Sequence, residues 1–216
     1  MKNIAVILSG CGVYDGSEIH EAVLSLLAVE QNGAKWQCFA PDIAQHHVVN
    51  HLTGEEMDET RNVLVEAARI ARGNIRDVKE LDVSEFDALL LPGGFGAAKN
   101  LSNFAFEGSA HTVNPDVLAA CKAFAQANKP AGYICISPVM IPAVYGEGAM
   151  GTIGTDHETA SAFSVMGGEH VECPVDGFVV DPARKVLSTP AYMLAGNISE
   201  AASGINKLVA KLVEMA

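Results

Sequence analysis

The sequence is poor in basic and aromatic side chains and has no long hydrophobic run. Its 14 lysines and arginines are outnumbered by 26 aspartates and glutamates, which leaves a formal net charge of −12. A chain of this charge repels nucleic acids and anionic membranes, so we expect neither as a partner. An anionic small substrate is not excluded, because the local field in a cleft can oppose the net charge. The N-terminal "MKNIAVILSG" is too short in its apolar part for a signal peptide, and no apolar run reaches the length of a membrane span.

Cysteine is scarce and scattered. The five cysteines are Cys11, Cys38, Cys121, Cys135 and Cys173, an odd number with no CxxC spacing. This pattern argues against a disulfide framework and against a zinc site, and it is typical of a reducing compartment. We therefore expect a cytoplasmic protein without a metal ion.

Strand-like and helix-like segments alternate along the 216 residues. An unbroken apolar run typical of a buried parallel strand occupies 4–8, and further strands are expected at 35–40, in 86–94 before a glycine turn, and at 131–136. Helices are expected from Ser17 to Asn32, from Asn114 to Lys129, from Ser137 onward and from about Tyr192 to the end. A further helix is expected over 59–72, after a capping box at 53–56. Short β-like pieces follow Met150. Length and alternation predict one domain over residues 1–216, an α/β fold with helices on both sides of a mostly parallel sheet.

The stretch "LSGCGVYDGSEIHE" joins the first predicted strand to the first predicted helix. Its GxGxxxG spacing resembles a dinucleotide-binding loop, but carboxylates at Asp15, Glu18 and Glu21 occupy the place that a pyrophosphate would need. We therefore interpret the glycines as a structural turn. Glu18 and Glu21 share a helix face, and either can be a surface acid or point across the carboxyl edge of the sheet. His20, between them, is expected to face another side.

Cys135 follows a buried strand and directly precedes an expected helix in "GYICISP". This is the geometry of a nucleophile elbow, in which the helix dipole lowers the pKa of the thiol. The glycine turn in "LPGGFGAAKNL" ends at the same sheet edge. The backbone N–H groups of Gly94 and Ile136 could therefore form an oxyanion hole. The alternatives are a core cysteine and an ordinary glycine-rich turn.

Together, "SEIHEAV", "LPGGFGAAKNL" and "YICISP" resemble the PfpI superfamily, which is related to class I glutamine amidotransferases. Within it the chain is similar to the ElbB branch, the glyoxalases also called enhancing-lycopene-biosynthesis proteins. Long matches run from "NIAVILSGCGVYDGSEIHEAV" to "TPAYMLAGNISEAASGINKLV" and cover nearly the whole chain.

The resemblance implies a flavodoxin-like three-layer sandwich with a nucleophilic Cys135. It places the family's helix glutamate at Glu21, with Glu18 as the alternative, and the oxyanion donors at Gly94 and Ile136. It implies conversion of glyoxal or methylglyoxal to glycolate or lactate, without glutathione, cofactor or metal. It also suggests a homodimer, a small dicarbonyl substrate and a link to isoprenoid biosynthesis.

One position departs from the wider superfamily. Its protease-like and amidase-like members have a histidine directly after the cysteine, where this chain has Ile136. We therefore do not expect peptidase or amidotransferase activity. The alternative to a glyoxalase is a redox-sensing cysteine protein with little or no turnover.

Overall fold

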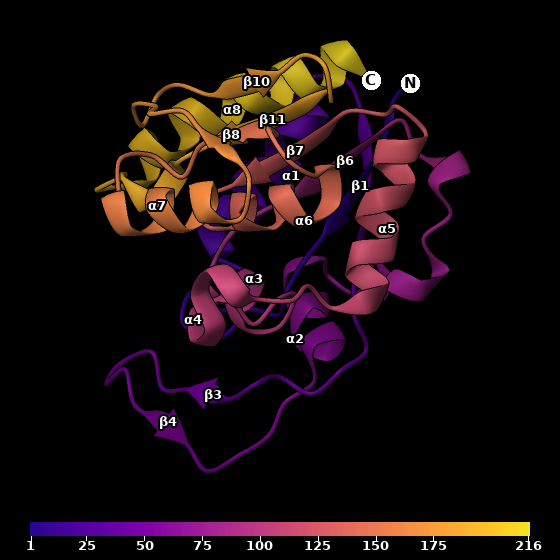
Figure 1. Cartoon of the computed structure of the whole chain (residues 1–216). Coiled ribbons are helices and arrows are strands. Elements are labelled where there is room, and N and C mark those ends of the chain that lie inside the picture. Colours follow the sequence, from indigo (N-terminus) through magenta and orange to yellow (C-terminus); the bar gives the residue numbers. More distant parts are fainter.

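The computed structural model describes residues 1–216 and is built around one seven-stranded sheet (Figure 1). In spatial order its strands are β10 (Val179–Asp181), β11 (Val186–Thr189), β7 (Ala131–Ile134), β6 (Ala88–Leu91), β1 (Asn3–Ile7), β2 (Lys35–Ala40) and β5 (Ile75–Asp77). Every pair is parallel except β10–β11, which is antiparallel. The predicted mostly parallel sheet is confirmed.

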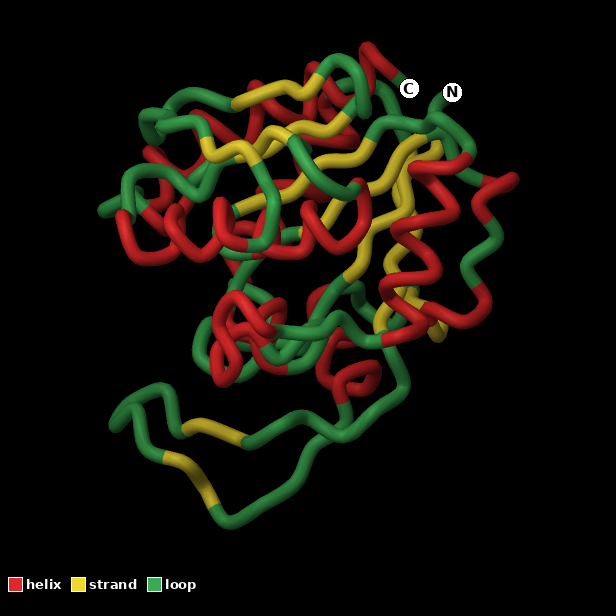
Figure 2. Tube along the Cα trace, in the orientation of Figure 1, coloured by secondary structure: helices red, strands yellow, loops and turns green.

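Helices cover both faces of the sheet (Figure 2). They are α1 (Ile19–Gln31), α2 (Val63–Ile70), α3 (Phe95–Lys99), α4 (Phe104–Glu107), α5 (Pro115–Gln126), α6 (Ile141–Tyr145), α7 (His157–Val165) and α8 (Ile198–Met215). Side chains alternate along β1, so that Ile4 and Val6 belong to a core with α1, α2 and α8, while Ala5 and Ile7 belong to a core with α5 and α6. The result is a flavodoxin-like three-layer α/β sandwich. None of the helices combines the length and apolar character that a membrane crossing requires.

The segment between β2 and α2 extends away from the body as an arm (Figure 1). It carries a hairpin of β3 (Val48–Val49) and β4 (Glu56–Met57). The capping box predicted at 53–56 is wrong, because this stretch forms the turn of the hairpin, where the Thr53 hydroxyl accepts a hydrogen bond from the Glu55 N–H. Helix α2 begins later than predicted and is capped by Asn62.

Three helix predictions differ from the structure in the second half of the chain. The segment after Cys135 is a 3₁₀ turn, Ser137–Met140, followed by the short α6, since Pro138 and Pro142 lack the N–H that a regular helix needs. Helix α7 was not predicted; in the chain it lies between β8 (Met150–Gly151) and β9 (Glu169–His170), which pair with each other. Helix α8 begins at Ile198 because the Asn197 side chain caps it.

The carboxyl edge of the sheet has a switch point at β1, which pairs with β6 on one side and β2 on the other. Open α/β folds place their sites at such an edge. There the loop after β1 packs directly against the loop after β6. A Cβ on Gly16 would overlap the Cys11 amide, and Gly94, at φ +94°, would overlap the Glu18 amide.

The amide groups of the opening loop bond within the loop instead of pointing to a ligand. Gly16 N–H donates to the Gly12 carbonyl at 2.7 Å, and Gly12 N–H donates to the Ser17 carbonyl at 2.9 Å. A pyrophosphate would need such donors free. The structure therefore agrees with a structural turn here.

Asn100, just after α3, holds three segments of this edge together. Its side-chain NH₂ donates to the carbonyls of Ser9 and Asp15, both at 2.9 Å, and its carbonyl accepts from His46 N–H at 2.9 Å. The side chain is buried, so water does not replace these partners. Asn100 thus fixes the β1 loop and the arm against the helix that follows Gly94.

Replacement of Asn100 by alanine should lower the free energy of unfolding by roughly 2–4 kcal/mol, because it leaves two buried carbonyls and one partly buried N–H without partners. Urea denaturation measures the change. Asn74→Ala is the control, since Asn74 is exposed and its side chain makes no hydrogen bond. Equal stability of the two variants would contradict the role assigned to Asn100.

Candidate functional site

Cys135 stands at the end of β7 in a backbone conformation that side chains rarely adopt, with φ +64°. Its N–H donates to the Thr189 carbonyl at 2.9 Å, which holds the turn against β11. The residue is 7% exposed and lines a cavity of about 800 Å³. The predicted elbow is present, with the thiol at the floor of the cavity.

Glu21 lies in the first turn of α1 and is fully buried beside this thiol. One carboxyl oxygen accepts from Gly93 N–H at 3.0 Å, and the other accepts from Tyr192 N–H at 3.1 Å. The carboxyl also forms a hydrogen bond with the Cys135 side chain. A single carboxyl group therefore connects α1 with the segments that follow β6, β7 and β11.

The pKa of Glu21 is raised to about 8, mainly by burial and also by the nearby negative charge of Glu18. The N–H groups of Tyr192 and Gly93 and the Cys135 side chain act in the opposite direction. The balance keeps the carboxyl protonated at neutral pH. Its oxygens accept from the two backbone N–H groups, and the Cys135 thiol donates toward the same carboxyl.

The pKa of the Cys135 thiol is also raised, first by burial and then by the charge of Glu21 when that group is ionised. The backbone N–H groups of Gly94 and Ile136 donate toward the sulfur and oppose this shift. The expected lowering of the thiol pKa is therefore wrong, because burial and Glu21 outweigh the backbone N–H groups. The segment after Cys135 is also a 3₁₀ turn and not a regular helix. The two groups titrate as a coupled pair that releases a first proton far more easily than a second.

Glu18 has a different place from Glu21. It is the N-cap of α1, where its carboxylate accepts from Glu21 N–H at 2.7 Å, and its side chain also lines the cavity. Only Glu21 forms a hydrogen bond with the thiol. The sequence left open which of the two glutamates contacts Cys135. In the structure Glu18 caps the helix, and Glu21 lies beside the cysteine.

Gly93 allows the thiol and the carboxyl to approach each other. A Cβ on Gly93 would overlap the Cβ of Cys135 and lie 2.7 Å from the Glu21 carboxyl. The next residue, Gly94, presents its N–H to the sulfur, as does Ile136. The structure thus brings together all five residues that the sequence singled out.

Two residues at this site were not anticipated. Tyr192 follows β11, supplies an N–H to Glu21 and lines the cavity. Its hydroxyl lies 2.8 Å from His20 Nδ1, and His20 in turn lies 3.9 Å from Glu18. The expectation that His20 faces away is therefore wrong. The sequence contained a signal for Tyr192, because "STPAY" lies where a strand ends at the same edge of the sheet.

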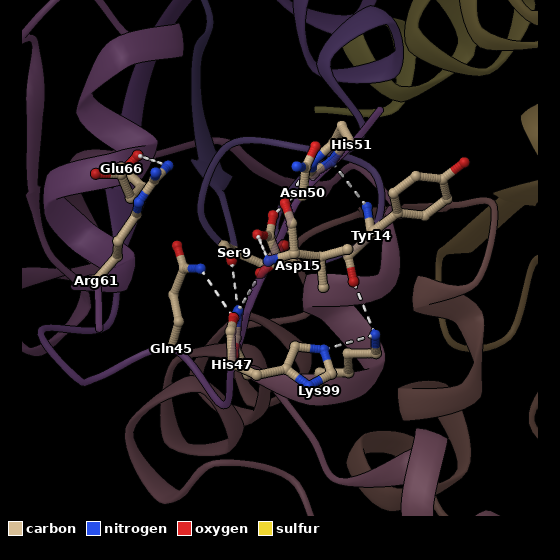
Figure 3. Close-up of polar contacts among 12 residues, drawn as sticks. Ser9, Tyr14, Asp15, Gln45, His47, Asn50, His51, Arg61, Glu66 and Lys99 are labelled. Carbon is tan, nitrogen blue, oxygen red and sulfur yellow. Dashed lines mark hydrogen bonds and ion pairs between the residues drawn. The ribbon is translucent and has the colours of Figure 1, made fainter. Parts of the chain in front are cut away.

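A separate polar cluster joins the β1 loop to the arm (Figure 3). Asp15, which is buried, accepts from Val49 N–H at 2.8 Å and lies 3.9 Å from His51. Lys99 donates to the Tyr14 carbonyl at 2.8 Å and lies 3.0 Å from His47. These side chains bond to each other and to the backbone. No group of histidine, cysteine, aspartate and glutamate in the structure has an arrangement suited to a metal ion.

Comparison with known proteins shows a relationship over nearly the whole chain. No family model matches the sequence. It is 44% identical over 222 residues to the human mitochondrial glutamine amidotransferase-like class 1 domain-containing protein 3, covering 98% of this chain and 82% of that protein. It is 40% identical to the crystal structure of an isoprenoid biosynthesis protein with an amidotransferase-like domain from Ehrlichia chaffeensis, with a TM-score of 0.92, over 99% of this chain and 100% of that one.

A more distant structure shares the fold alone. A DJ-1 superfamily protein from Salmonella typhimurium is 19% identical, with a TM-score of 0.60, over 99% of this chain and 91% of that one. The expected cytoplasmic location is wrong by the evidence of the relatives, since the human protein and the matching ES1 proteins of rat and zebrafish are all named as mitochondrial. Cysteine usage separates oxidising from reducing compartments, but not one reducing compartment from another.

The identity to the human protein and the three-layer fold lead to one conclusion: the chain belongs to the glutamine amidotransferase-like class 1 family, which has the DJ-1/PfpI fold.

Proposed function

We propose that the chain is a glyoxalase-type cysteine enzyme that converts glyoxal or methylglyoxal to glycolate or lactate without glutathione. One observation carries the proposal: the buried Glu21 carboxyl lies beside the Cys135 side chain, which lines a cavity. An acid and a nucleophile in direct contact suit a reaction that combines nucleophilic addition with proton transfer. The similarity of the sequence to the ElbB branch supports the same reaction.

The first step starts from the pair with one proton, after the Cys135 thiol has released its proton to water while Glu21 keeps its own. The Cys135 thiolate then adds to the aldehyde carbon. The sulfur–carbon bond forms as the carbonyl π-bond breaks, and the oxygen gains the electron pair. Glu21 gives its proton to that oxygen, so a hemithioacetal forms and Glu21 becomes a carboxylate. The N–H groups of Gly94 and Ile136 stabilise the negative charge, which moves from sulfur to oxygen.

The second step is an internal transfer of hydrogen. The Glu21 carboxylate removes the proton from the former aldehyde carbon, which leaves an enediolate with the negative charge on the neighbouring oxygen. Glu21 then returns this proton to the neighbouring carbon, and the proton of the first hydroxyl passes to the second oxygen. The first carbon is oxidised to a thioester and the second is reduced to an alcohol, so no external oxidant or reductant is needed. Water then cleaves the thioester, which releases the hydroxy acid and restores the thiol.

The two competing functions fit the site less well. A peroxide sensor needs an accessible thiolate, whereas Cys135 is 7% exposed and burial raises the pKa of its thiol. An amidotransferase needs a basic group beside the cysteine. Here the side chain that follows is Ile136, and the carboxyl that touches the sulfur carries a proton at neutral pH.

Cys135→Ser should lower glyoxal consumption on the order of a thousandfold or more, because a buried serine hydroxyl is a much weaker nucleophile. Glycolate formation followed by chromatography measures the loss. Cys11→Ser is the matched control and should keep wild-type activity, since Cys11 lies outside the cavity. Full activity of the Cys135 variant would refute the proposal.

Glu21→Gln should reduce kcat by roughly 10²–10⁴-fold, because the amide cannot exchange protons with the substrate. Glu18→Gln should keep activity within about tenfold, since glutamine retains an oxygen that caps α1. Steady-state kinetics of both variants measures the contrast. If only the Glu18 variant were inactive, the roles of the two glutamates would be reversed.

Glu21 should also leave a signature in the pH dependence of stability. Its pKa is about 8 in the folded state and about 4.3 in the unfolded chain, so between these values the folded state holds an extra proton. The contribution of Glu21 to the free energy of unfolding therefore falls as pH rises, by about 1.4 kcal/mol per pH unit. Denaturation curves from pH 5 to 8 should show this slope in wild type relative to Glu21→Gln. Parallel curves for the two proteins would show that Glu21 is ionised throughout.

A further inference from the structure

We infer that the cavity over Cys135 selects its substrate by charge: it accepts uncharged or cationic electrophiles and rejects those that carry a carboxylate or a phosphate. For the reacting group this inference rests on the proposed function, because it takes the electrophile to be an aldehyde. The charge selection itself depends only on the side chains that surround the thiol.

The ionisable side chains that line the cavity, apart from the thiol and the Tyr192 phenol, are three carboxylates: Glu18, Asp156 and Glu158. No lysine, arginine or histidine lines it. Glu18 stands at the start of α1, and Asp156 and Glu158 stand at the start of α7, where both are exposed. The cavity that contains the thiol is thus lined by negative charge from two separate elements.

No lysine or arginine pairs with these carboxylates; hydrogen bonds from Thr159 lower the pKa of Asp156, and His157 is the basic neighbour that also lowers it. Asp156 and Glu158 form no ion pair, and the carboxylate of Asp156 accepts instead from Thr159 N–H at 2.8 Å. The only basic group near Glu18 is His20, at 3.9 Å. Lys99 points away from the thiol, with its ammonium bonded to the Tyr14 carbonyl and 4.9 Å from the centre of the Phe95 ring. An anion entering the cavity meets repulsion without a compensating partner.

The rest of the wall is apolar and leaves more room than methylglyoxal needs. Phe95, Phe104, Ile136 and Met193 line the cavity, and alanines fill much of the remainder. Pockets of roughly 300–1,000 Å³ hold drug-sized ligands, and this one measures about 800 Å³. The cavity therefore has space for an aldehyde with an apolar or amine-bearing substituent, and the acids at its mouth favour the amine.

The test uses alkylation of Cys135, because that reaction needs no turnover. Rate constants are measured by mass spectrometry of the Cys135 peptide with iodoacetamide, which is neutral, with iodoacetate and with 2-bromoethylammonium. Each is divided by the rate constant for a free thiol, which removes the intrinsic reactivity of the reagent. We expect the normalised rate for iodoacetate to be at least about tenfold below that for iodoacetamide, with 2-bromoethylammonium at or above iodoacetamide. Added salt should narrow the difference.

The variant Asp156→Asn/Glu158→Gln removes two of the charges and keeps a capping oxygen at position 156. It should bring the iodoacetate rate several-fold closer to the iodoacetamide rate. Glu55→Gln/Glu80→Gln, which removes two exposed charges outside the cavity, is the matched control and should leave the ratio unchanged. Equal normalised rates in wild type, or a shift of the same size in the control, would overturn the inference.

The outcomes for charge selection and for the proposed function are separable. If Cys135→Ser still consumed glyoxal at the wild-type rate, the glyoxalase proposal would fail, and a strong preference for iodoacetamide would still support charge selection. If the alkylation rates showed no preference, charge selection would fail, whatever the enzyme activity.

Discussion

The buried carboxyl of Glu21 is the group on which the geometry of the site depends. It accepts one N–H from the loop after β6 and one from the segment after β11, and it bonds to the thiol after β7. A helix residue close to the N-terminus thus connects three parallel strands at their carboxyl ends. If that carboxyl were displaced, the N–H groups of Gly93 and Tyr192 would lose their acceptors and Cys135 would lose the acid that bonds to its sulfur.

Burying this carboxyl has an electrostatic consequence that shapes the chemistry. Removal from water raises the pKa of both Glu21 and Cys135, so a second negative charge on the pair is strongly disfavoured. One proton shared between sulfur and oxygen is the state that addition to a carbonyl needs. The carboxylates that line the cavity also disfavour a second negative charge on this pair, because they add negative potential near the thiol.

Much of the fold was predictable because its signals are local. Apolar runs marked β1, β2, β6 and β7, and Asn114-Pro115 marked the start of α5. The secondary-structure predictions failed where tertiary contacts or the backbone chemistry of proline compete with the local residue pattern. The stretch around Thr53 has the letters of a capping box, yet it forms a hairpin turn, and prolines break the expected helix after Cys135. Helix α7 has too weak an apolar stripe to stand out in the sequence.

The sequence by itself determined the layers and the location of the site at the carboxyl edge, since strand and helix periodicity follow from the order of residues and parallel strands end at one edge. Only the tertiary structure decided which glutamate meets the cysteine, because Glu18 and Glu21 share a helix face and differ only in what packs against them. It also revealed Tyr192 and the acidic mouth, which join residues distant in the chain. The tertiary structure also explains the glycines of "LSGCGVYDGSEIHE", which permit close approaches of the backbone, and it shows that the glutamate at the end of that stretch is the one that lies beside Cys135.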